Sequence, residues 1–294
     1  MIPELEIYKP NNIDEALALL NELNSDVKII AGGTDVVPGM QQGSARFKNF
    51  SSLMDVGNIP DLQRIELCDD KICIGAGVKF SDLNRNKLIR KYFPLLAEAA
   101  GKVGSKQIRN LATVGGNFVN NAPCADSVPP LLVYDAKLRI RSSNSERLID
   151  LEEFLIKPYK TQLKPDELVA EIIIPLVDDN YRGEFYKLGR RRAVSISRIT
   201  LAVLLKSADN TITNLRVASG AVSPIGKRIY KVEKYAKGKT ITEELLKELS
   251  TMLGREILGE TGLRWSSPYK LPVVQQMFYQ LLLDLSPNGK VRQI

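Results

Sequence analysis

The sequence predicts an α+β protein of two domains. Short helical and strand patterns alternate over residues 1–176, with apolar residues recurring at helical or at strand spacing. Pro175 and the polar segment Asp178-Asp179-Asn180 then interrupt the pattern, because proline cannot donate to a strand ladder. Beyond the interruption, three strand patterns come before two helical patterns. We therefore expect one domain over residues 1–176 and a smaller C-terminal domain over 180–290.

The first domain begins with a helix and a strand that lead into a glycine turn. Asn12 is placed to cap a helix over 13–23, with Glu15 three residues later as in a capping box. The strand expected over 27–30 runs directly into the glycine turn. The other expected elements are strands over 54–56, 65–67, 72–76, 138–140 and 168–174, a helix from Ser81 to residue 90, and a helix over 95–100.

The C-terminal domain is predicted to place helices against an antiparallel sheet. Strands are expected over 185–188, 199–206 and 211–219, and the last two are joined across 208–210. Thr242 caps a helix that runs to residue 252, and Ser267-Pro268 opens another. Apolar residues recur at helical spacing over 271–285, which indicates a face packed into the core.

Two glycine segments are the main functional signal in the sequence. They are Ala31-Gly32-Gly33-Thr34-Asp35 and Ala112-Thr113-Val114-Gly115-Gly116-Asn117. A glycine pair puts no Cβ between backbone and ligand and permits positive φ, so that successive N–H groups can converge on an anionic oxygen. Neither segment is a G-x-G-x-x-G or P-loop motif, which disfavours those nucleotide folds. From the spacing alone, two tight bends required by packing remain an equal alternative.

Composition excludes several kinds of chemistry. The chain has no histidine, so a Ser-His-Asp triad, a histidine metal site and a histidine-tethered flavin are absent. Its three cysteines, Cys68, Cys73 and Cys124, contain no C-x-x-C pair, and we expect reduced thiols and no metal site. Cys124 follows the second glycine segment, where it either lines a pocket or packs in the core. A bound cofactor must therefore supply any demanding chemistry.

Charge and hydropathy indicate a protein of the cytoplasm. The net charge is +7, but its cations are interleaved with acids, which disfavours nucleic acid as a partner. No apolar run approaches the roughly 20 residues needed to span a bilayer, so no membrane is expected. The one tight cationic cluster, Arg190-Arg191-Arg192, lacks the aromatic platform of a single-strand binder. It could attract cofactor phosphates, contact a subunit or simply be solvated.

Several segments resemble the FAD-binding medium subunits of molybdenum hydroxylases, the xanthine dehydrogenase family. They are Lys28 to Asp35, Gln107 to Asn117, Ala125-Asp126-Ser127, Asp135 to Leu138, Phe185 to Arg191, Gly220 to Pro224 and Ser267 to Lys270. The resemblance runs essentially end to end. It implies an FAD-binding domain of the vanillyl-alcohol-oxidase superfamily type, with subdomains at about 1–56 and 57–176, followed by a smaller α/β domain.

The resemblance also implies which residues hold FAD. The pyrophosphate is expected on Lys28, Ile29, Ile30, Ala31, Gly32, Gly33, Thr34, Asp35 and Val36. The second wall is expected from Val103, Gly104, Ile108, Ala112, Thr113, Gly116, Asn117, Ala125, Asp126 and Val169, with Val103 and Gly104 beside the ring. Asp126 is expected to accept a hydrogen bond from a ribityl or ribose hydroxyl, although a helix-capping role also suits it. Lys187 is expected to be catalytic, as a cation that stabilises the reduced flavin, unless it is an ordinary surface lysine.

In the family so resembled, the flavin subunit works within a larger complex. A molybdopterin centre on a large subunit hydroxylates a heterocycle or aldehyde, and [2Fe-2S] clusters on a small subunit relay electrons to FAD. The FAD then reduces NAD or another acceptor. We therefore expect a heterotrimer or a dimer of heterotrimers, with xanthine or another purine as substrate ahead of nicotinate, carbon monoxide and aldehydes. A stand-alone FAD-dependent oxidoreductase and a non-enzymatic binding module remain alternatives.

Overall fold

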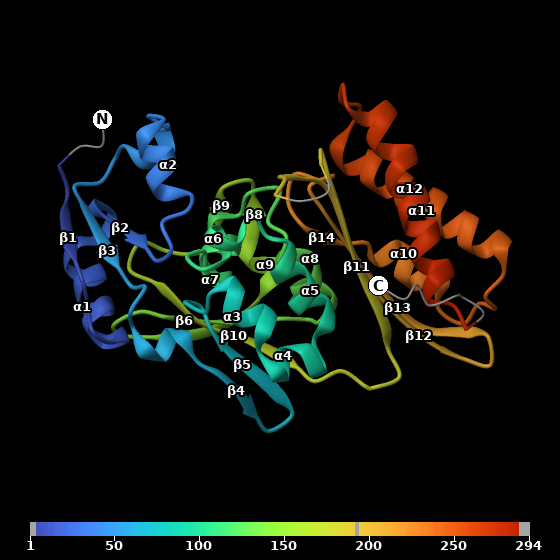
Figure 1. Cartoon of the computed structure of the whole chain (residues 1–294), viewed down its shortest axis with the longest axis horizontal. Helices are drawn as coiled ribbons and strands as arrows, with labels where there is room; N and C mark the ends of the chain where they lie inside the picture. Colours follow the sequence, from blue (N-terminus) through green and yellow to red (C-terminus); the bar gives the residue numbers. More distant parts are fainter. Residues whose placement is uncertain (1–3, 192–193, 288–294) are drawn as a thin grey trace.

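Successive β-sheets organise the chain (Figure 1). The computed structural model describes residues 4–191 and 194–287, and within them the strands form sheets of three, five, four and two strands. The three-stranded sheet is parallel, with β1 (Glu6–Tyr8) and β2 (Val27–Ile30) on either side of β3 (Ser52–Asp55). Helix α1 (Ile13–Leu23) buries Ala16, Leu17 and Leu20 in the core of this sheet, and short α2 (Val36–Gln41) follows the first glycine turn. The helix and strand predicted here are both confirmed.

An antiparallel sheet of order β4-β5-β10-β6-β7 forms the middle of the molecule. Its strands are β4 (Ile65–Cys68), β5 (Lys71–Gly75), β6 (Lys137–Arg141), β7 (Glu146–Asp150) and β10 (Leu168–Pro175). Successive residues of β10 face different cores: Leu168 and Ala170 pack with α1, whereas Val169 and Ile172 pack with the central helices. This strand therefore ties the first sheet to the central one.

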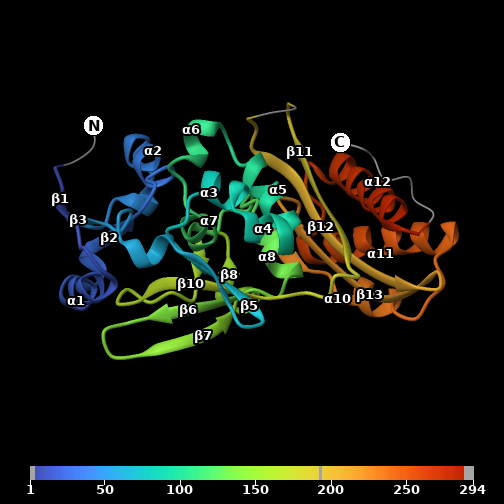
Figure 2. The same ribbon diagram turned by 60° about the horizontal axis from the view of Figure 1, so that its bottom comes forward.

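Helices cover the central sheet on one face (Figure 2). They are α3 (Phe80–Arg85), α4 (Lys87–Tyr92), α5 (Pro94–Lys102), α6 (Lys106–Arg109), α7 (Val114–Asn120), α8 (Val128–Val133) and α9 (Leu151–Phe154), beside the two-stranded β8 (Leu155–Lys157) and β9 (Lys160–Thr161). The single helix predicted from Ser81 to residue 90 is wrong. Asn86 interrupts it, because this side chain accepts from the backbone N–H groups of Leu88 and Ile89 and so begins α4.

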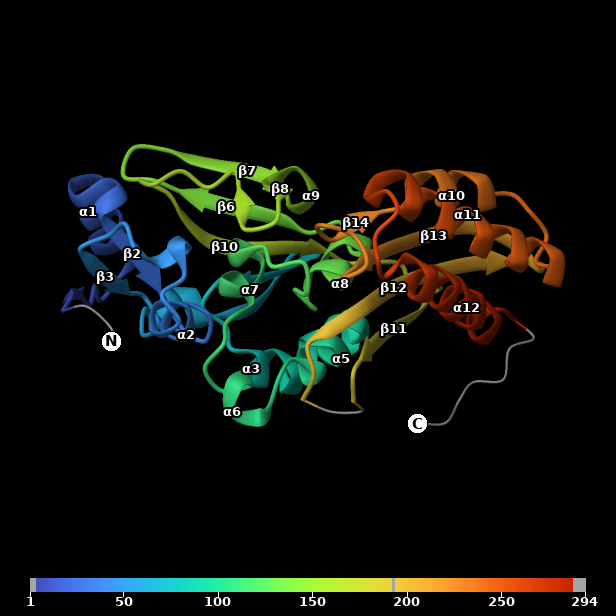
Figure 3. The same cartoon turned by 90° about the horizontal axis from the view of Figure 1, so that it is seen from above.

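The C-terminal sheet packs on both of its faces. Its strands are β11 (Arg182–Gly189), β12 (Ser197–Ala208), β13 (Thr211–Gly220) and β14 (Lys227–Arg228), covered by α10 (Tyr230–Ala236), α11 (Glu243–Thr261) and α12 (Ser267–Leu285). Figure 3 shows these three helices on one side of the sheet and α5 and α8 on the other. Along β12, Leu201 and Val203 pack with the outer helices, whereas Ala202 and Leu204 pack with the central core.

The sequence predicted three of these strands and the two long helices, several of them too short, and it missed β14 and α10. Helix α11 continues nine residues past the predicted end at 252, and β11 begins three residues earlier than predicted. The apolar stripe of α12 is confirmed as core, because Val274, Phe278 and Leu281 are buried. Within the described residues, no helix is both long and apolar enough to cross a bilayer.

A buried ion-pair network joins the two halves of the chain. Arg228 of β14 makes two 2.6 Å hydrogen bonds to the carboxylate of Glu233 on α10, and a third of 2.7 Å to Asp135 beyond α8. Asp135 also pairs with Arg216 of β13 at 2.7 Å. Arg228 and Glu233 are both buried, so each charge depends on its partner for the interactions that water would otherwise provide.

We expect Glu233→Leu to lower the free energy of unfolding by about 3–5 kcal/mol, because Arg228 would be left buried without its principal partner. Urea denaturation monitored by circular dichroism measures the loss. As a control, Lys247→Met removes an exposed ion pair with Glu243 on α11 and should cost at most about 1 kcal/mol. Equal losses in the two variants would contradict this account.

Candidate functional site

A cavity of about 980 Å³ is lined by residues of the three-stranded, the five-stranded and the four-stranded sheets and of their connections. Its wall is built mainly from residues within 27–36, 103–126 and 159–169, together with Lys187 and residues 194–197, and with further residues from 46–47 and 76–80. Ligand pockets in proteins commonly hold about 300–1,000 Å³, so this cavity is at the large end of that range. It is large enough to suit an extended ligand such as a dinucleotide.

The two glycine segments touch each other at the cavity. A Cβ built on Gly32 would lie 2.1 Å from the carbonyl oxygen of Leu111 and 2.9 Å from the Cα of Ala112, so a side chain at this position would push the segments apart. Gly33, beside it, has a φ of +67°, a conformation that residues with side chains rarely adopt. Gly32 is therefore needed for the two glycine segments to come into contact.

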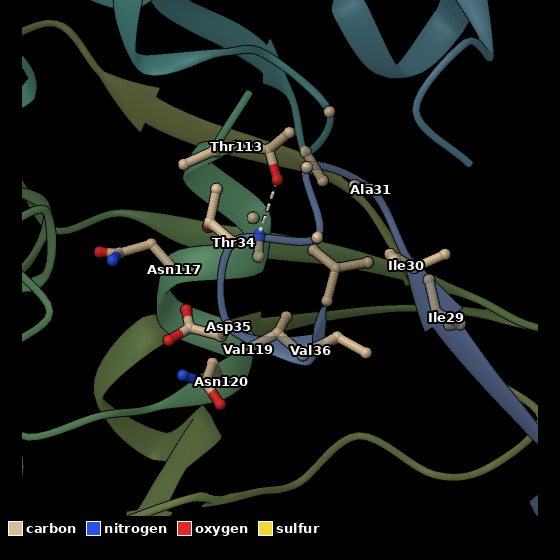
Figure 4. A pocket seen from close by; sticks show the side chains of 18 of the residues that line it. Ile29, Ile30, Ala31, Thr34, Asp35, Val36, Thr113, Asn117, Val119 and Asn120 are labelled. Carbon is tan, nitrogen blue, oxygen red and sulfur yellow. Dashed lines mark hydrogen bonds between the residues drawn. The ribbon is translucent and has the colours of Figure 1, made fainter. Parts of the chain in front are cut away.

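The second glycine segment is the first turn of a helix and not a loop. Thr113 is the N-cap of α7, and its hydroxyl accepts a 3.1 Å hydrogen bond from the backbone N–H of Gly116 (Figure 4). A Cβ on Gly115 would lie 2.5 Å from the carbonyl oxygen of Ala76, which explains that glycine by packing. A Cβ on Gly116 would meet only Thr113 Oγ1, at 2.9 Å, among the described atoms within 4 Å. Its absence keeps the cavity open at this point.

A buried ion pair occupies the wall between the two domains. The Nζ of Lys187 on β11 lies 2.6 Å from Oδ2 of Asp126 and donates a 2.8 Å hydrogen bond to the carbonyl oxygen of Lys102. Ser197 of β12 donates to the other carboxylate oxygen of Asp126. Burial raises the pKa of Asp126, and the ammonium of Lys187 counteracts that rise. Asp126 is therefore not a helix cap, and Lys187 is not a surface lysine.

A second group of wall residues gave no signal in the sequence. The guanidinium carbon of Arg46 lies 3.8 Å from the ring centre of Tyr159, and its Nη1 donates a 3.0 Å hydrogen bond to the side-chain oxygen of Asn120. All three line the cavity. They come from three separate segments without a shared motif or periodicity, so only the folded chain brings them together.

Burial and neighbouring charges shift the pKa values of several groups on the cavity wall. Burial lowers the pKa of Lys28, and nearby Arg46 lowers it further. Burial raises the pKa of Asp35, and Arg46 opposes that change. The thiol pKa of Cys124 is raised by burial and then by the carboxylates of Asp126 and Asp35.

The structure brings nearly all of the predicted site residues to this one cavity. Those on its wall are Lys28, Ile29, Ile30, Ala31, Gly32, Gly33, Thr34, Asp35, Val36, Val103, Gly104, Ile108, Ala112, Thr113, Gly116, Asn117, Asp126, Val169 and Lys187. Ala125 is the exception, because its methyl group is buried in the central core and does not line the cavity.

The structure also shows where the residues lie whose roles the sequence left open. Cys124 lines the cavity, whereas Cys73 is buried in β5 and Cys68 is half-buried. Arg190 and Arg191 are exposed and do not line the cavity, although residues 194–197 just beyond them do; Arg192 lies outside the described residues. Within the part of the chain that the structure describes, no group of three or more potential metal ligands occurs.

The wall fits the chemistry of FAD. Thr34, Asp35, Thr113 and Asn117 place polar and charged side chains near the glycine segments (Figure 4). Val103, Ile108 and Val169 add apolar surface to the same wall. Lys28 and Arg46 supply positive charge suited to a diphosphate. Because Gly116 has no side chain, the wall leaves room for such an anion beside the first turn of α7.

Comparison with known proteins agrees with this geometry. A family model described as the FAD binding domain in molybdopterin dehydrogenase matches residues 3–177, and one described as the CO dehydrogenase flavoprotein C-terminal domain matches residues 184–285. The xanthine dehydrogenase FAD-binding subunit of Escherichia coli O157:H7 is 29% identical over 97% of this chain and 98% of that protein. The carbon monoxide dehydrogenase medium chain of Hydrogenophaga pseudoflava is 28% identical over 95% and 96%.

Solved structures give the same result for the fold. A carbon monoxide dehydrogenase from Hydrogenophaga pseudoflava superposes with a TM-score of 0.90 at 27% identity, covering 97% of this chain and 98% of that one. Quinoline 2-oxidoreductase from Pseudomonas putida 86 superposes with a TM-score of 0.88 at 21% identity, covering 97% and 98%. The predicted α+β fold of two domains is confirmed.

We expect Lys187→Met to lower the free energy of unfolding by about 3–5 kcal/mol, because the Asp126 carboxylate would stay buried without its cation. The double variant Asp126→Asn with Lys187→Met should recover part of the loss, since no unpaired charge remains. Urea denaturation of both variants measures these changes. Lys231→Met, at an exposed ion pair with Glu256, is the control and should change stability by no more than about 1 kcal/mol.

Proposed function

We propose that this chain, which belongs to the family of FAD-binding domains in molybdopterin dehydrogenases, takes electrons from [2Fe-2S] clusters of a partner subunit and passes them through FAD to a soluble acceptor. The resemblance seen in the sequence is confirmed, and the chain is an FAD-binding medium subunit of the molybdenum hydroxylase family, an oxidoreductase.

The contact between the two glycine segments is the observation that carries the proposal. It brings the backbone of Gly32 to Asp35 and the first turn of α7 to one stretch of cavity wall, where the diphosphate of FAD would bind. Hydrogen bonds from protein donors to a charged phosphate contribute about 1.5–3 kcal/mol each. Val103, Gly104 and Ile108 line the same cavity and would flank the flavin ring.

The chain's own groups would bind and orient the cofactor. FAD supplies the chemistry, because it accepts two electrons and can release them one at a time or as a pair. Asp126 already accepts from Lys187 and Ser197, but a carboxylate has about four acceptor sites and can also accept from a ribityl hydroxyl. Lys187 is fixed by Asp126 and by the carbonyl of Lys102, so its positive charge is held in place beside the ring.

We propose xanthine or another purine as the substrate of the assembled enzyme and NAD as its acceptor. Full-length similarity to the xanthine dehydrogenase FAD-binding subunit supports the first assignment. Nearly equal similarity to a carbon monoxide dehydrogenase medium chain and to a nicotinate dehydrogenase FAD-subunit makes carbon monoxide and nicotinate the alternatives. Molybdopterin and the iron–sulfur clusters would reside on a large and a small partner subunit, in a dimer of heterotrimers located in the cytoplasm.

Isolation of the native complex tests this assignment. The tagged chain should co-purify with two other subunits, with molybdenum and iron in the preparation, and with NAD reduction that depends on xanthine. Reduction supported by nicotinate or carbon monoxide instead would change the substrate assignment alone. A yellow monomer that oxidises an organic substrate unaided would contradict the subunit role and favour a stand-alone flavin enzyme.

We expect Gly116→Val to weaken FAD binding at least about tenfold, because its side chain would occupy space on the cavity wall and displace Thr113 Oγ1. Quenching of flavin fluorescence on titration into apoprotein measures the affinity. Gly259→Val on α11 is the matched control, since a Cβ there has nothing within 4 Å among the described atoms. Gly33 is less suitable, because its φ of +67° would strain any substitution. Unchanged affinity in Gly116→Val would contradict the placement of FAD.

A further inference from the structure

Arg46 connects the two sides of the cavity from a segment that the glycine motifs do not include. It lies in the short 3₁₀ turn Ala45–Phe47, on the side of the three-stranded sheet. Its two partners, Asn120 at the end of α7 and Tyr159 in the turn between β8 and β9, belong to the central sheet's side. All three side chains line the cavity. Arg46 therefore spans the cavity at one end.

The position of Tyr159 is fixed by its backbone. Asn121, buried and left-handed with a φ of +46°, donates from its side chain to the carbonyl oxygens of Lys157 and Lys160 at 2.9 and 3.0 Å. Its own carbonyl oxygen accepts a 2.9 Å hydrogen bond from the N–H of Tyr159. Tyr159 itself has a φ of +61°, which is costly for a residue with a side chain. Such strained residues concentrate where a protein clamps a ligand.

The direct partners of Arg46 among the described residues are uncharged, although the Asp35 carboxylate is near enough for Arg46 to oppose the rise in its pKa. Among the residues that the structure describes, no carboxylate forms an ion pair with Arg46, and its partners are an amide oxygen and an aromatic ring. By contrast, Lys187 pairs with Asp126, and Lys164 lies 3.9 Å from Glu167. A cation held by neutral groups on a cavity wall is well suited to exchange them for a charged phosphate oxygen, because such a bond is about twice as strong as a neutral one.

The contacts of Arg46 and Lys187 determine which part of the ligand each of them meets. Lys187 is hydrogen-bonded to the carbonyl oxygen of Lys102, next to Val103 and Gly104. Arg46 instead contacts Asn120, at the C-terminal end of α7, and Tyr159. The first glycine segment meets the chain between these places, at Leu111 and Ala112 just before α7. A diphosphate bound at the middle, with the flavin ring toward Lys187, leaves the Arg46 end for the adenosine side. This placement rests on the function proposed above.

We propose that Arg46, held by Asn120 and Tyr159, forms the end of the cavity that binds the adenosine monophosphate half of FAD. The guanidinium pairs with the phosphate nearer to the adenosine, and the Tyr159 ring offers a flat surface beside the base. In consequence this end, which FMN lacks the atoms to reach, determines the preference for FAD over FMN.

Flavin titrations of apoprotein variants test the proposal. Arg46→Met should raise the dissociation constant for FAD about 10- to 100-fold, as expected for one lost charge-assisted hydrogen bond, and change that for FMN less than about threefold. Arg46→Lys should give an intermediate value, because it keeps the charge but loses the planar fork. Tyr159→Phe should bind FAD as the wild type does, whereas Tyr159→Leu should bind it more weakly. Arg255→Met on exposed α11 is the charge-matched control.

The outcomes separate this inference from the proposed function. If Arg46→Met weakens FAD and FMN equally, Arg46 acts only by holding the cavity together, and the inference is wrong. Unchanged FAD affinity would also overturn it, while leaving FAD binding itself intact. Failure of the wild type to bind FAD would remove the proposed function as well. Circular dichroism of each variant shows that it is folded, and Arg46→Lys serves if Arg46→Met is not.

Discussion

The close contact between two backbone segments determines how the cavity is built. Gly32 and the Leu111 to Ala112 peptide are in direct contact, and a single methyl group between them would force them apart. Because of this contact, the end of β2 and the beginning of α7 share one wall of a cavity, although some eighty residues separate them in the chain. The residues just after β2 and those of the first turn of α7 therefore face the same cavity.

The C-terminal sheet extends the same wall to the second domain. Since β12 packs Ala202 and Leu204 against the central core, the neighbouring β11 is held where Lys187 can reach Asp126. Ser197, the first residue of β12, contacts the same carboxylate. The site is therefore not built by one domain and covered by the other. The Asp126 to Lys187 ion pair forms only when the two domains pack together. The buried ion pairs of Arg228 with Asp135 and Glu233 also stabilise that packing.

What the sequence could predict follows from how local each signal is. Helix caps such as Asn12 and glycine segments act over a few residues, so their elements and the cavity's two main walls were predictable. The break at Asn86 was missed because its capping role depends on local hydrogen bonds to the N–H groups of Leu88 and Ile89, which the sequence does not show. The second glycine segment was expected as a turn, yet the Thr113 cap makes it helical. Ala125 was placed by resemblance to the site, but its side chain packs into the core.

The other features that the sequence did not reveal are contacts between residues far apart in the chain. Lys187 was expected near the cofactor, but its pairing with Asp126 joins residues 61 positions apart and needs the folded domains. Arg46, Asn120 and Tyr159 likewise meet only across the cavity. The two groups differ in a way that matters chemically. The Asp126 to Lys187 pair is neutral overall, whereas Arg46 is a cation whose hydrogen-bond and ring partners are uncharged. In FAD the charged diphosphate lies between the uncharged isoalloxazine ring and the adenosine, so a neutral pair suits the ring and a cation suits the phosphate nearer to the adenosine.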